Sequence, residues 1–505
     1  MALRDDQIGG QLIGSGWLAG QGEEFLSEPA SGAARRFTSA TSAEVDGAAR
    51  AAEDAFAAFA ATTAQHRARF LDRIAAEMRA REERITVIAC AETGLPEARI
   101  RAEFARTTGQ LRLFAQHALT RGWLDERHDP GLPTRIPPRP DLRLIQRPVG
   151  PVAVFAASNF PLAFSVAGGD TASALAVGCP VIVKAHQAHL ATSEIVADAV
   201  DTARKAERLP PGTFALLQSA TRMTGTALVT HPLVRAVGFT GSTVGGRALF
   251  DLCAARPEPI PFYGELGSVN PLFVLRGAGL RRGAEIARAW ATSLTQGAGQ
   301  FCTKPGLVIL PAGEIAERFL QVAVEALAET PSQCMLSDTI AQGFRVSIAR
   351  LEEKSGVVTG HNTVAKEGRD MGPVLLRTTA DAFLADPEMA EEAFGPGGLA
   401  ITVADPEEAV ALARSLSGQL TATVHGDPED QAEARALFGI LERKAGRLIW
   451  NGFPTGVEVA DAMVHGGPFP ASTNFGHTSV GTLSIRRWLR PACYQDIPSG
   501  LTPVR

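Results

Sequence analysis

From residue 143 onward, short apolar runs that favour β-strands alternate with alanine-rich runs of helical spacing. A helix between successive strands returns the chain to the same edge of a sheet, so this alternation predicts parallel strands covered by helices. The first series has strand-like runs at 151–157, 180–184, 213–217 and 235–239, and helical runs at 166–177, 190–206, 222–229 and 243–254. We therefore expect an α/β fold built on a doubly wound parallel sheet.

A second α/β alternation occupies residues 261–465, with apolar runs at 271–275, 305–310, 398–403, 420–424 and 447–451. The chain has 505 residues, whereas a single hydrophobic core stops growing at roughly 250–300 residues. The sequence thus predicts two sheets in two domains.

Two further segments lie outside these alternations. Residues 43–80 and 94–119 have the apolar spacing of packing helices. Between about 125 and 142 the chain is rich in proline and arginine, which excludes a helix and favours an extended excursion. We expect an arm or a strand-like linker there.

The overall composition excludes several functional classes. A formal net charge of −5 supplies no basic field for nucleic acid. The most apolar stretch, Val149 to Val183, is interrupted by Asn159, Pro161 and Pro180, so it is better interpreted as strand, helix and strand than as a membrane span. The first residues lack the pattern of a secretory signal. We expect a cytoplasmic protein that binds neither nucleic acid nor membrane.

Among the cysteines, Cys302 has the most informative setting. The six cysteines are scattered, without a Cys-x-x-Cys pair or a histidine at zinc-ligand spacing, so we expect neither a disulfide framework nor a metal site. Cys302 follows Gly297-Ala298-Gly299-Gln300-Phe301, where small residues leave room for a substrate and glycines let backbone N–H groups approach an oxyanion. Taken alone, the segment also fits a buried, inert cysteine.

Two polar residues stand near apolar strands. Glu265 lies in an apolar, glycine-bearing turn, an environment that can raise the pKa of a carboxyl group and poise it as a general base. Asn159 follows the apolar run 151–157, which places its amide at the carboxyl edge of the sheet, where it can stabilise an oxyanion. A salt-bridged turn residue and a turn-forming asparagine are the alternatives.

The segment Phe239-Thr240-Gly241-Ser242-Thr243-Val244-Gly245-Gly246 follows a strand-like run and opens a helical one. The N–H groups of a helix N-terminus can receive phosphate, so this segment is a candidate dinucleotide site. It is not a P-loop, because Arg247 and Ala248 stand where lysine and serine or threonine are required. A generic strand–turn–helix junction is the alternative.

Six segments occur together in one order, and together they identify a family. They are Asn159-Phe160-Pro161, Lys184, Gly241-Ser242-Thr243, Glu265-Leu266-Gly267, Gly299-Gln300-Phe301-Cys302 and Glu392-Ala393-Phe394-Gly395-Pro396. In these segments the chain resembles the aldehyde dehydrogenase superfamily, from about residue 10 to residue 495. The resemblance implies the aldehyde dehydrogenase fold, an α/β fold with two doubly wound parallel-sheet domains and a small oligomerisation arm.

The resemblance also implies how the chain is divided. A dinucleotide-binding domain would comprise residues 1–125 and 147–260, and a catalytic domain carrying the nucleophile would comprise 261–465. Residues 126–146 and 466–505 would form the oligomerisation arm and tail, which pair subunits into a homodimer or homotetramer.

The resemblance implies three catalytic roles. Cys302 would be the nucleophile, Asn159 would form the oxyanion hole with the Cys302 backbone N–H, and Glu265 would activate the deacylating water. The thiolate would attack a small aldehyde, a hydride would pass to nicotinamide, and the thioester would be hydrolysed to the carboxylate.

The same resemblance assigns the cofactor contacts. Lys184 and Glu392 would hold ribose hydroxyls, and Gly241, Ser242 and Phe394 would also contact the dinucleotide. NAD-preferring members commonly carry glutamate at the position of Gln187, so Gln187 removes a charge that would repel a 2′-phosphate. Arg222 is a candidate cationic partner for that phosphate, and we expect NADP to be slightly favoured over NAD.

Within the superfamily the chain looks most like the 2,5-dioxopentanoate (α-ketoglutaric semialdehyde) dehydrogenase branch, through Val183-Lys184-Ala185-His186 and Met463-Val464-His465-Gly466-Gly467-Pro468 among other segments. In this family the helix around 101–112 borders the aldehyde tunnel. Arg106 could meet the carboxylate of a semialdehyde and Gln110 its keto oxygen, with Phe160 also at the substrate, or this helix face could be solvated.

Three other functions stay open at this point. The branch lies near bacterial NADP-dependent fatty or broad-range aldehyde dehydrogenases. In a CoA-acylating enzyme the CoA thiol would resolve the thioester in place of water, and the presence of Glu265 argues against this. A silent structural scaffold is disfavoured by the presence of Cys302, Glu265 and Asn159.

Overall fold

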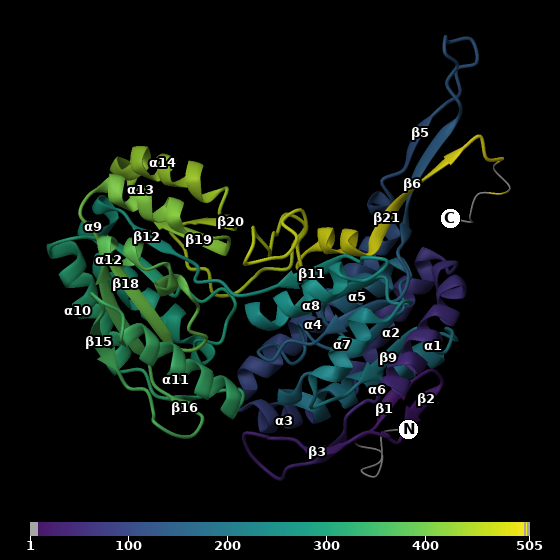
Figure 1. Cartoon of the computed structure of the whole chain (residues 1–505), viewed down its shortest axis with the longest axis horizontal. Coiled ribbons are helices and arrows are strands. Elements are labelled where there is room, and N and C mark those ends of the chain that lie inside the picture. The colour runs from purple at the N-terminus through teal and green to yellow at the C-terminus, as the bar shows by residue number, and fades with distance from the viewer. Residues whose placement is uncertain (1–8, 499–500, 502–505) are drawn as a thin grey trace.

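The computed structural model describes residues 9–498 and 501, and most of its strands fall into two seven-stranded sheets. Figure 1 shows each sheet with its helices as a separate unit, the two lying side by side, and a narrow arm projecting from the unit that contains the N-terminal half. The expectation that the first residues carry no secretory signal lies outside the described residues. No helix among residues 9–498 and 501 has the length and apolar character needed to cross a membrane.

The first sheet has the strand order β11-β10-β7-β8-β9-β1-β2. Its five parallel strands are β7 (Val152–Phe155), β8 (Val181–Lys184), β9 (Phe214–Leu217), β10 (Ala236–Thr240) and β11 (Phe262–Glu265). Two antiparallel strands, β1 (Gln11–Ile13) and β2 (Gly16–Leu18), extend its far edge. The predicted parallel sheet is confirmed, and four of its five parallel strands lie at the predicted runs.

Both faces of this sheet are buried, which explains why its strands are apolar throughout. Val152 and Val154 pack into a core on one face, whereas Ala153 and Phe155 pack into a second core on the other face. Successive side chains of a strand point to opposite faces, so a sheet covered on both sides needs apolar residues at every position.

The helices of the first unit are α1 (Ser42–Ala60), α2 (Ala64–Arg79), α3 (Glu82–Thr93), α4 (Glu97–Thr120), α5 (Gly169–Val177), α6 (Leu190–Ala206), α7 (Arg222–Thr230) and α8 (Thr243–Ala254). The helical run at 43–80 is divided into α1 and α2, because the Thr63 hydroxyl caps a new helix by accepting from His66 N–H. Helix α4 begins three residues later than predicted, since Gly94 is left-handed and Pro96 precedes the first turn.

The second sheet has the order β15-β17-β18-β13-β12-β19-β20, parallel except for β15. These strands are β12 (Leu272–Val274), β13 (Leu307–Pro311), β15 (Val358–Asn362), β17 (Val374–Thr379), β18 (Gly397–Val403), β19 (Gln419–His425) and β20 (Ala445–Trp450). Its helices are α9 (Arg276–Thr295), α10 (Glu314–Ala328), α11 (Asp338–Glu352), α12 (Ala380–Ala385), α13 (Pro406–Ser415) and α14 (Gln431–Leu441). Two short pairs, β3 (Glu24–Leu26) with β4 (Arg36–Thr38) and β14 (Gln333–Cys334) with β16 (Asp370–Met371), lie outside the main sheets.

The chain passes from the first sheet to the second later than the expected boundary at residue 261. Strand β11 pairs in parallel with β10 along its whole length, from Val237 opposite Phe262 to Thr240 opposite Glu265. The second sheet begins only with β12. Glu265 is therefore the last residue of a first-sheet strand, and the catalytic carboxylate expected in the second domain comes from the edge of the first sheet.

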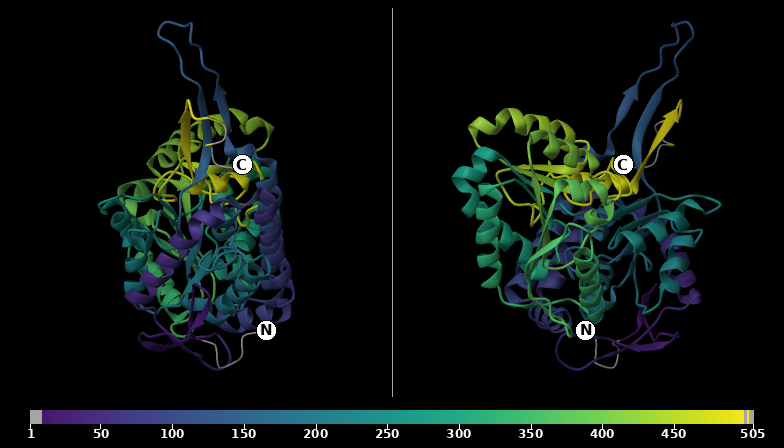
Figure 2. Two further views of the ribbon diagram at one scale, coloured as in Figure 1. Left: turned by 90° about the vertical axis from the view of Figure 1, so that its right-hand side faces the viewer. Right: turned by 60° about the vertical axis from the view of Figure 1, so that its left-hand side comes forward.

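The arm is a three-stranded antiparallel sheet of β5 (Arg127–Asp129), β6 (Leu142–Pro148) and β21 (Leu489–Gln495). The proline-rich stretch between β5 and β6 forms its tip. Figures 1 and 2 show that the arm projects from the body in every view and that the C-terminal strand β21 lies along it. Two segments more than 340 residues apart are thus joined, in register from Leu489 opposite Pro148 to Gln495 opposite Leu142.

Candidate active site

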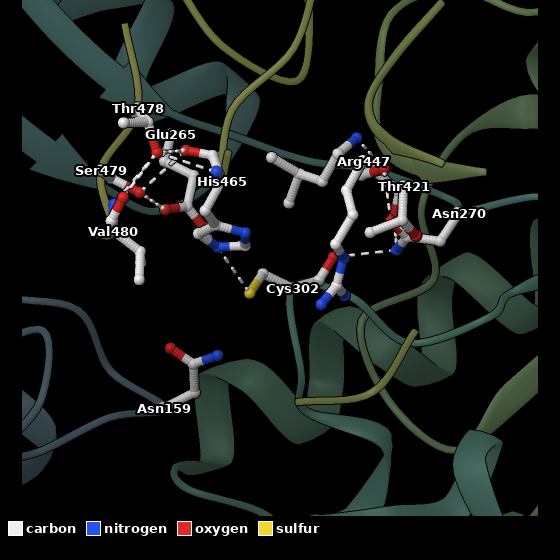
Figure 3. Close-up of polar contacts among 12 residues, drawn as sticks. Asn159, Glu265, Asn270, Cys302, Thr421, Arg447, His465, Thr478, Ser479 and Val480 are labelled. Carbon is white, nitrogen blue, oxygen red and sulfur yellow. Dashed lines mark hydrogen bonds and ion pairs between the residues drawn. The ribbon is translucent and has the colours of Figure 1, made fainter. Parts of the chain in front are cut away.

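The polar residues singled out from the sequence converge between the two sheets. Glu265 ends β11, Asn159 follows β7, and Cys302 lies in the loop that joins α9 to β13. Parallel strands present their carboxyl ends at one edge of a sheet, and ligands bind in the crevice outside that edge. Figure 3 shows the Cys302 thiol between Asn159 on one side and Glu265 with His465 on the other.

The loop that carries Cys302 adopts an uncommon backbone conformation. Gly297, Ala298 and Gly299 all have positive φ, at 59°, 56° and 64°. A Cβ atom on Gly299 would lie 2.3 Å from the Gly395 carbonyl oxygen, so only glycine fits there. Ala298 carries a left-handed conformation that L-residues adopt at a cost, as happens at sites where the backbone must be held in place.

Two buried side chains fix this loop. Asn270 donates from Nδ2 to the carbonyl oxygens of Cys302 and Lys304, both at 2.9 Å. The Lys304 ammonium in turn donates to the carbonyl oxygens of Ala393, Gly395 and Gly397. These bonds join the nucleophile loop to the segment that contains Glu392, so both parts of the site are positioned together.

His465 completes the cluster around the thiol, and the sequence reasoning did not select it as a site residue. Its Nε2 lies 2.8 Å from Glu265 Oε1 and 3.4 Å from Cys302 Sγ. The Ser479 hydroxyl donates to the other carboxylate oxygen of Glu265 at 2.7 Å. His465 is 163 residues from Cys302 along the chain, so no local spacing signals the contact. The sequence signal that could have identified His465 was the segment Met463 to Pro468, which resembles the 2,5-dioxopentanoate dehydrogenase branch.

The electrostatics of the cluster differ from the expectation for Glu265. Burial raises the pKa of its carboxyl group, but the charge and hydrogen bond of His465, with hydrogen bonds from Ser479 and Cys302, outweigh burial and lower it. The expected rise in the Glu265 pKa is therefore wrong. Burial and the nearby Glu265 carboxylate raise the pKa of the Cys302 thiol well above its usual value. The pair thus favours an ionised carboxylate beside a protonated thiol.

Asn159 faces the thiol from the opposite side. Its Nδ2 donates to the Gln300 carbonyl oxygen at 2.9 Å, which holds the amide next to the nucleophile loop. The amide group carries two N–H donors, and this bond uses one of them. The second is available to an oxygen bound above Cys302, as an oxyanion hole requires.

A cavity of about 690 Å³ opens onto this cluster from the first sheet. Asn159, Glu265 and Cys302 lie at one end, and residues of the β8–α6, β10–α8 and 392–394 segments line the rest, including His186, Gln187, Gly241, Ser242, Glu392 and Phe394. The cavity joins the nucleophile to the helix N-terminus of α8, where Ser242 is the N-cap residue.

Comparison with models of protein families shows which family this chain belongs to. The model of the aldehyde dehydrogenase family matches residues 26–468. The chain belongs to the aldehyde dehydrogenase family. It is an oxidoreductase that acts on aldehydes, and with the family comes the use of NAD or NADP.

Curated relatives cover nearly the whole of this aldehyde dehydrogenase. It is 49% identical over 501 residues to alpha-ketoglutaric semialdehyde dehydrogenase 2 of Azospirillum brasilense, covering 98% of this chain and 95% of the relative. It is 45% identical to an alpha-ketoglutaric semialdehyde dehydrogenase of Acinetobacter baylyi, covering 92% and 89%. Its fold is similar to that of 1-pyrroline-5-carboxylate dehydrogenase from Thermus with bound NAD, with a TM-score of 0.82 at 23% identity over 97% of this chain and 94% of the other. The expected family and fold are confirmed.

Most of the expected cofactor residues surround the cavity. Lys184 ends β8 next to it, and burial lowers the pKa of its ammonium to about 8. Burial raises the pKa of the Glu392 carboxyl to about 7, opposed by the charge of Lys304. Gln187 is exposed and donates weakly to the Ser219 carbonyl oxygen at 3.5 Å. Arg222 opens α7 on the exposed surface and does not line the cavity.

The expected substrate residues are not among those that line the cavity. Arg106 is half-buried, its guanidinium donates to the Val457 carbonyl oxygen, and it interacts electrostatically with Cys302. The Phe160 ring contacts Phe301 edge-on, with centroids 5.4 Å apart. The Gln110 amide is buried without a hydrogen-bond partner among the described residues and packs on the start of α5 at Gly169.

The helix face that carries these residues is not solvated. Glu103 is 2% and Gln110 is 4% exposed. Glu103 forms an ion pair with Arg99 at 2.7 Å and accepts from the N–H groups of Leu162 and Ala163. The alternative of a solvated face of α4 is therefore wrong, because this face packs against the segment that follows Asn159.

The ligand-type atoms of Glu265, Cys302 and His465 lie within 4.8 Å of one another. Such a cluster is able to hold a metal ion, although the sequence indicated no metal site. Each of the three groups already has a hydrogen-bond partner inside the cluster, which suits proton transfer among them.

Proposed function

We propose that this enzyme oxidises 2,5-dioxopentanoate to 2-oxoglutarate with NAD or NADP, through a thioester on Cys302. Two relatives named alpha-ketoglutaric semialdehyde dehydrogenase, at 49% and 45% identity over most of the chain, support the substrate. The observation that carries the chemistry is the Cys302 thiol held against the Glu265 carboxylate and the His465 imidazole.

The first half of the reaction forms the acyl-enzyme. The Cys302 thiol gives its proton to the Glu265 carboxylate, to which it is hydrogen-bonded, and the sulfur adds to the aldehyde carbon. The Asn159 amide and the Cys302 backbone N–H stabilise the oxyanion that develops. The bound dinucleotide supplies the acceptor for the hydride. The thiol and the carboxylate need no large movement, because both already lie within one cluster.

The second half hydrolyses the thioester. After Glu265 has lost its proton to solvent, its carboxylate takes a proton from a water molecule, whose oxygen adds to the thioester carbonyl. Collapse of the adduct breaks the carbon–sulfur bond and releases the carboxylic acid, and the departing thiolate takes from Glu265 the proton that came from water, which returns Cys302 to the thiol. The His465 N–H donates to Glu265 at 2.8 Å and keeps this carboxylate oriented in both halves.

For the cofactor, Lys184 and Glu392 are assigned to the ribose hydroxyls, and Gly241, Ser242 and Phe394 to the remaining dinucleotide contacts. The cavity supports this assignment, because Gly241, Ser242, Phe394 and Glu392 line it together with Cys302. A preference for NADP rests on Gln187, which leaves no carboxylate to repel a 2′-phosphate. Arg222 would have to reach that phosphate from the surface of α7.

A panel of aldehydes assayed with NAD⁺ and with NADP⁺ tests the proposal. We expect 2,5-dioxopentanoate to have a far higher kcat/KM than hexanal or benzaldehyde, and 2-oxoglutarate to form without CoA. Similar efficiency on long unsubstituted aldehydes would assign the enzyme to the fatty or broad-range class instead. A requirement for CoA would show that a thiol resolves the thioester.

The cofactor preference has its own test. Arg222→Ala should reduce kcat/KM with NADP⁺ by roughly tenfold, because a charge-assisted contact to phosphate is lost, and should leave NAD⁺ unchanged. Equal losses with both cofactors would remove Arg222 from the phosphate site.

A further inference from the structure

Two arginines from opposite units of the fold converge on one loop beside the nucleophile. Arg106 belongs to α4 of the first unit, and Arg447 belongs to β20 of the second. The Arg106 guanidinium donates to the Val457 carbonyl oxygen, and that of Arg447 donates to the carbonyl oxygens of Pro454 and Gly456. Gly456 and Val457 are consecutive, so the two guanidiniums bind the same short loop.

Both guanidiniums lie near the reacting sulfur. Each interacts electrostatically with Cys302, and Figure 3 shows Arg447 next to Cys302, on the side away from Glu265 and His465. Arg447 therefore lies on a side of Cys302 that the Glu265 carboxylate does not occupy, where the far end of a substrate has room. An extended five-carbon semialdehyde has four carbon–carbon bonds between its aldehyde and carboxylate carbons, about 5 Å in all, so its carboxylate would lie only a short distance from the sulfur.

Neither cation has a protein anion as partner. Within residues 9–498 and 501, both guanidiniums donate hydrogen bonds to backbone carbonyl oxygens, that of Arg106 also lies 5.9 Å from the Phe164 ring centroid, and no carboxylate forms an ion pair with either. The Nε atoms of Arg106 and Arg447 are both buried without a hydrogen-bond partner. Burial lowers the pKa of each guanidinium, and at Arg106 the charge of Glu103, with a smaller effect of Glu458, opposes this shift.

Nearby Arg99 shows how the protein treats a buried cation that binds no ligand. Arg99 also comes from α4 and lies against the Phe160 and Phe301 rings, and its Nε is likewise buried without a hydrogen-bond partner, but Glu103 neutralises its charge at 2.7 Å. Buried charges are normally paired, because removing an unpaired charge from water is unfavourable. The missing ion pair therefore distinguishes Arg106 and Arg447 from Arg99, and two half-buried guanidiniums without a carboxylate partner beside Cys302 form a site for an anion.

We propose that Arg447, together with Arg106, binds the carboxylate of the substrate during oxidation. This inference rests on the proposed function, which supplies a semialdehyde with a carboxylate at its far end, and it assigns to Arg447 a specificity role that the sequence did not indicate. Arginine forks match the two oxygens of a carboxylate. Because one arginine comes from each unit, the bound carboxylate bridges the two units of the enzyme.

The test compares an acid aldehyde with a neutral one of equal chain length. The ratio of kcat/KM for 2,5-dioxopentanoate to that for pentanal is measured in the wild type, in Arg447→Gln and in Arg377→Gln. Arg377 is an exposed arginine on β17 of the same sheet, which makes it the matched control. We expect Arg447→Gln to lower the ratio roughly tenfold or more, chiefly through the acid substrate, and Arg377→Gln to leave it unchanged.

A binding measurement separates specificity from damage to the fold. Glutarate has two carboxylates and no aldehyde, so its calorimetric dissociation constant reports the subsite without catalysis. Arg447→Gln should weaken glutarate binding, and Arg447→Lys, which keeps the cation and serves where Gln does not fold, should restore part of it. If the wild type prefers the acid but Arg447→Gln keeps both the ratio and the glutarate affinity, the subsite is refuted and the proposed function stands. If the wild type shows no preference for the acid, the proposed function itself fails.

Discussion

The position of one nitrogen atom determines how the three groups at the thiol share their protons. His465 Nε2 is the atom that faces both Glu265 and Cys302. While Glu265 is ionised, this nitrogen must carry its hydrogen to donate to the carboxylate, so it cannot accept the thiol proton at the same time. Glu265 is then the proton acceptor of the cluster, and His465 is a donor that holds it and lies close enough to stabilise the thiolate.

Cys302→Ala is expected to abolish aldehyde oxidation and to leave dinucleotide affinity nearly unchanged. The sulfur forms the covalent intermediate, whereas the cavity is lined by many other residues. Steady-state assays and a fluorescence titration with NADP⁺ measure the two properties. Cys493→Ala, which removes an exposed thiol, is the control and should behave as the wild type. Substantial turnover by Cys302→Ala would reject the nucleophile.

Glu265→Gln separates the two halves of the reaction. We expect a burst of about one hydride equivalent per site, formed more slowly than in the wild type, followed by turnover at least roughly 100-fold lower. The amide keeps the shape of the side chain but cannot take a proton from water. Stopped-flow absorbance of the reduced cofactor resolves the burst, and the exposed Glu258→Gln serves as the control. If no burst forms, Glu265 is required before the thioester exists.

At the scale of elements, a buried carboxyl joins helix α6 to the N-terminal strands. Glu194 is 1% exposed, its Oε1 accepts from Gly9 N–H and Gln218 Nε2, and its Oε2 has no partner among the described residues. Burial, with the nearby Glu92, raises its pKa from 4.5 to about 7 despite these hydrogen bonds. The folded protein therefore holds this proton more tightly than the unfolded chain does.

This carboxyl should make the fold less stable as the pH rises. Below pH 4.5 Glu194 is protonated in both the folded and the unfolded state, so its contribution to folding stability is fully present. This contribution is lost as the pH rises to about 7, where the folded protein must ionise the buried carboxyl. The loss is at most about 3 kcal/mol. We expect the melting temperature of Glu194→Gln to rise relative to the wild type between pH 5 and pH 8, since glutamine carries no charge. Glu353→Gln, at an exposed position, should show no such trend. If the melting temperatures of Glu194→Gln and the wild type change in parallel with pH, Glu194 does not ionise in the folded protein over this range.

A helix or strand can be predicted from the sequence when the interactions that form it are local. Strands buried on both faces, such as β7 and β8, are apolar throughout, so they stand out in the sequence. Strand β11 was missed because Tyr263, Gly264 and Glu265 carry polar groups or no side chain, and its place at the sheet edge depends on pairing with β10. Division of 43–80 into two helices depends on one hydroxyl cap at Thr63.

The same limit applies to the site. Cys302, Glu265 and Asn159 lie in short segments with recognisable neighbours, and the fold brings them together. His465 contacts Glu265 and Cys302, and Arg447 interacts electrostatically with Cys302, in each case across more than 140 positions of the chain, so no local pattern distinguishes them from other histidines and arginines. The direction of the Glu265 pKa was mispredicted for this reason, because the partner that lowers it is His465.

At the scale of the whole molecule, the active site is made where the two units meet. Residues of both units line the cavity, Glu265 ends a strand of the first sheet, and the Cys302 loop and Arg447 belong to the second unit. Catalysis therefore depends on the relative placement of two bodies with separate cores. An assembly that holds the first unit against a neighbouring subunit would restrict that placement.

The surface of the arm indicates that the chain assembles with other copies of itself. Ile136 at its tip is 96% exposed and Leu132 is 40% exposed, and the outer strand β5 is paired on one side only. Apolar side chains and free strand edges on a projecting hairpin are normally covered by a partner. We expect a homodimer or homotetramer in which the arm contacts another copy of the chain.

Ile136→Asp should weaken this assembly without harming the fold of the subunit. A carboxylate at the arm tip would have to be desolvated in the interface, whereas in a free subunit it would remain in water. Light scattering coupled to size exclusion should therefore show a smaller mass at low protein concentration for Ile136→Asp than for the wild type, with unchanged far-UV circular dichroism. Val87→Asp places the same charge at a 64% exposed apolar position on α3 of the body and should leave the mass unaltered. If both variants keep the wild-type mass, the arm tip lies outside the interface, and the exposed edge of β5 becomes the segment to alter next.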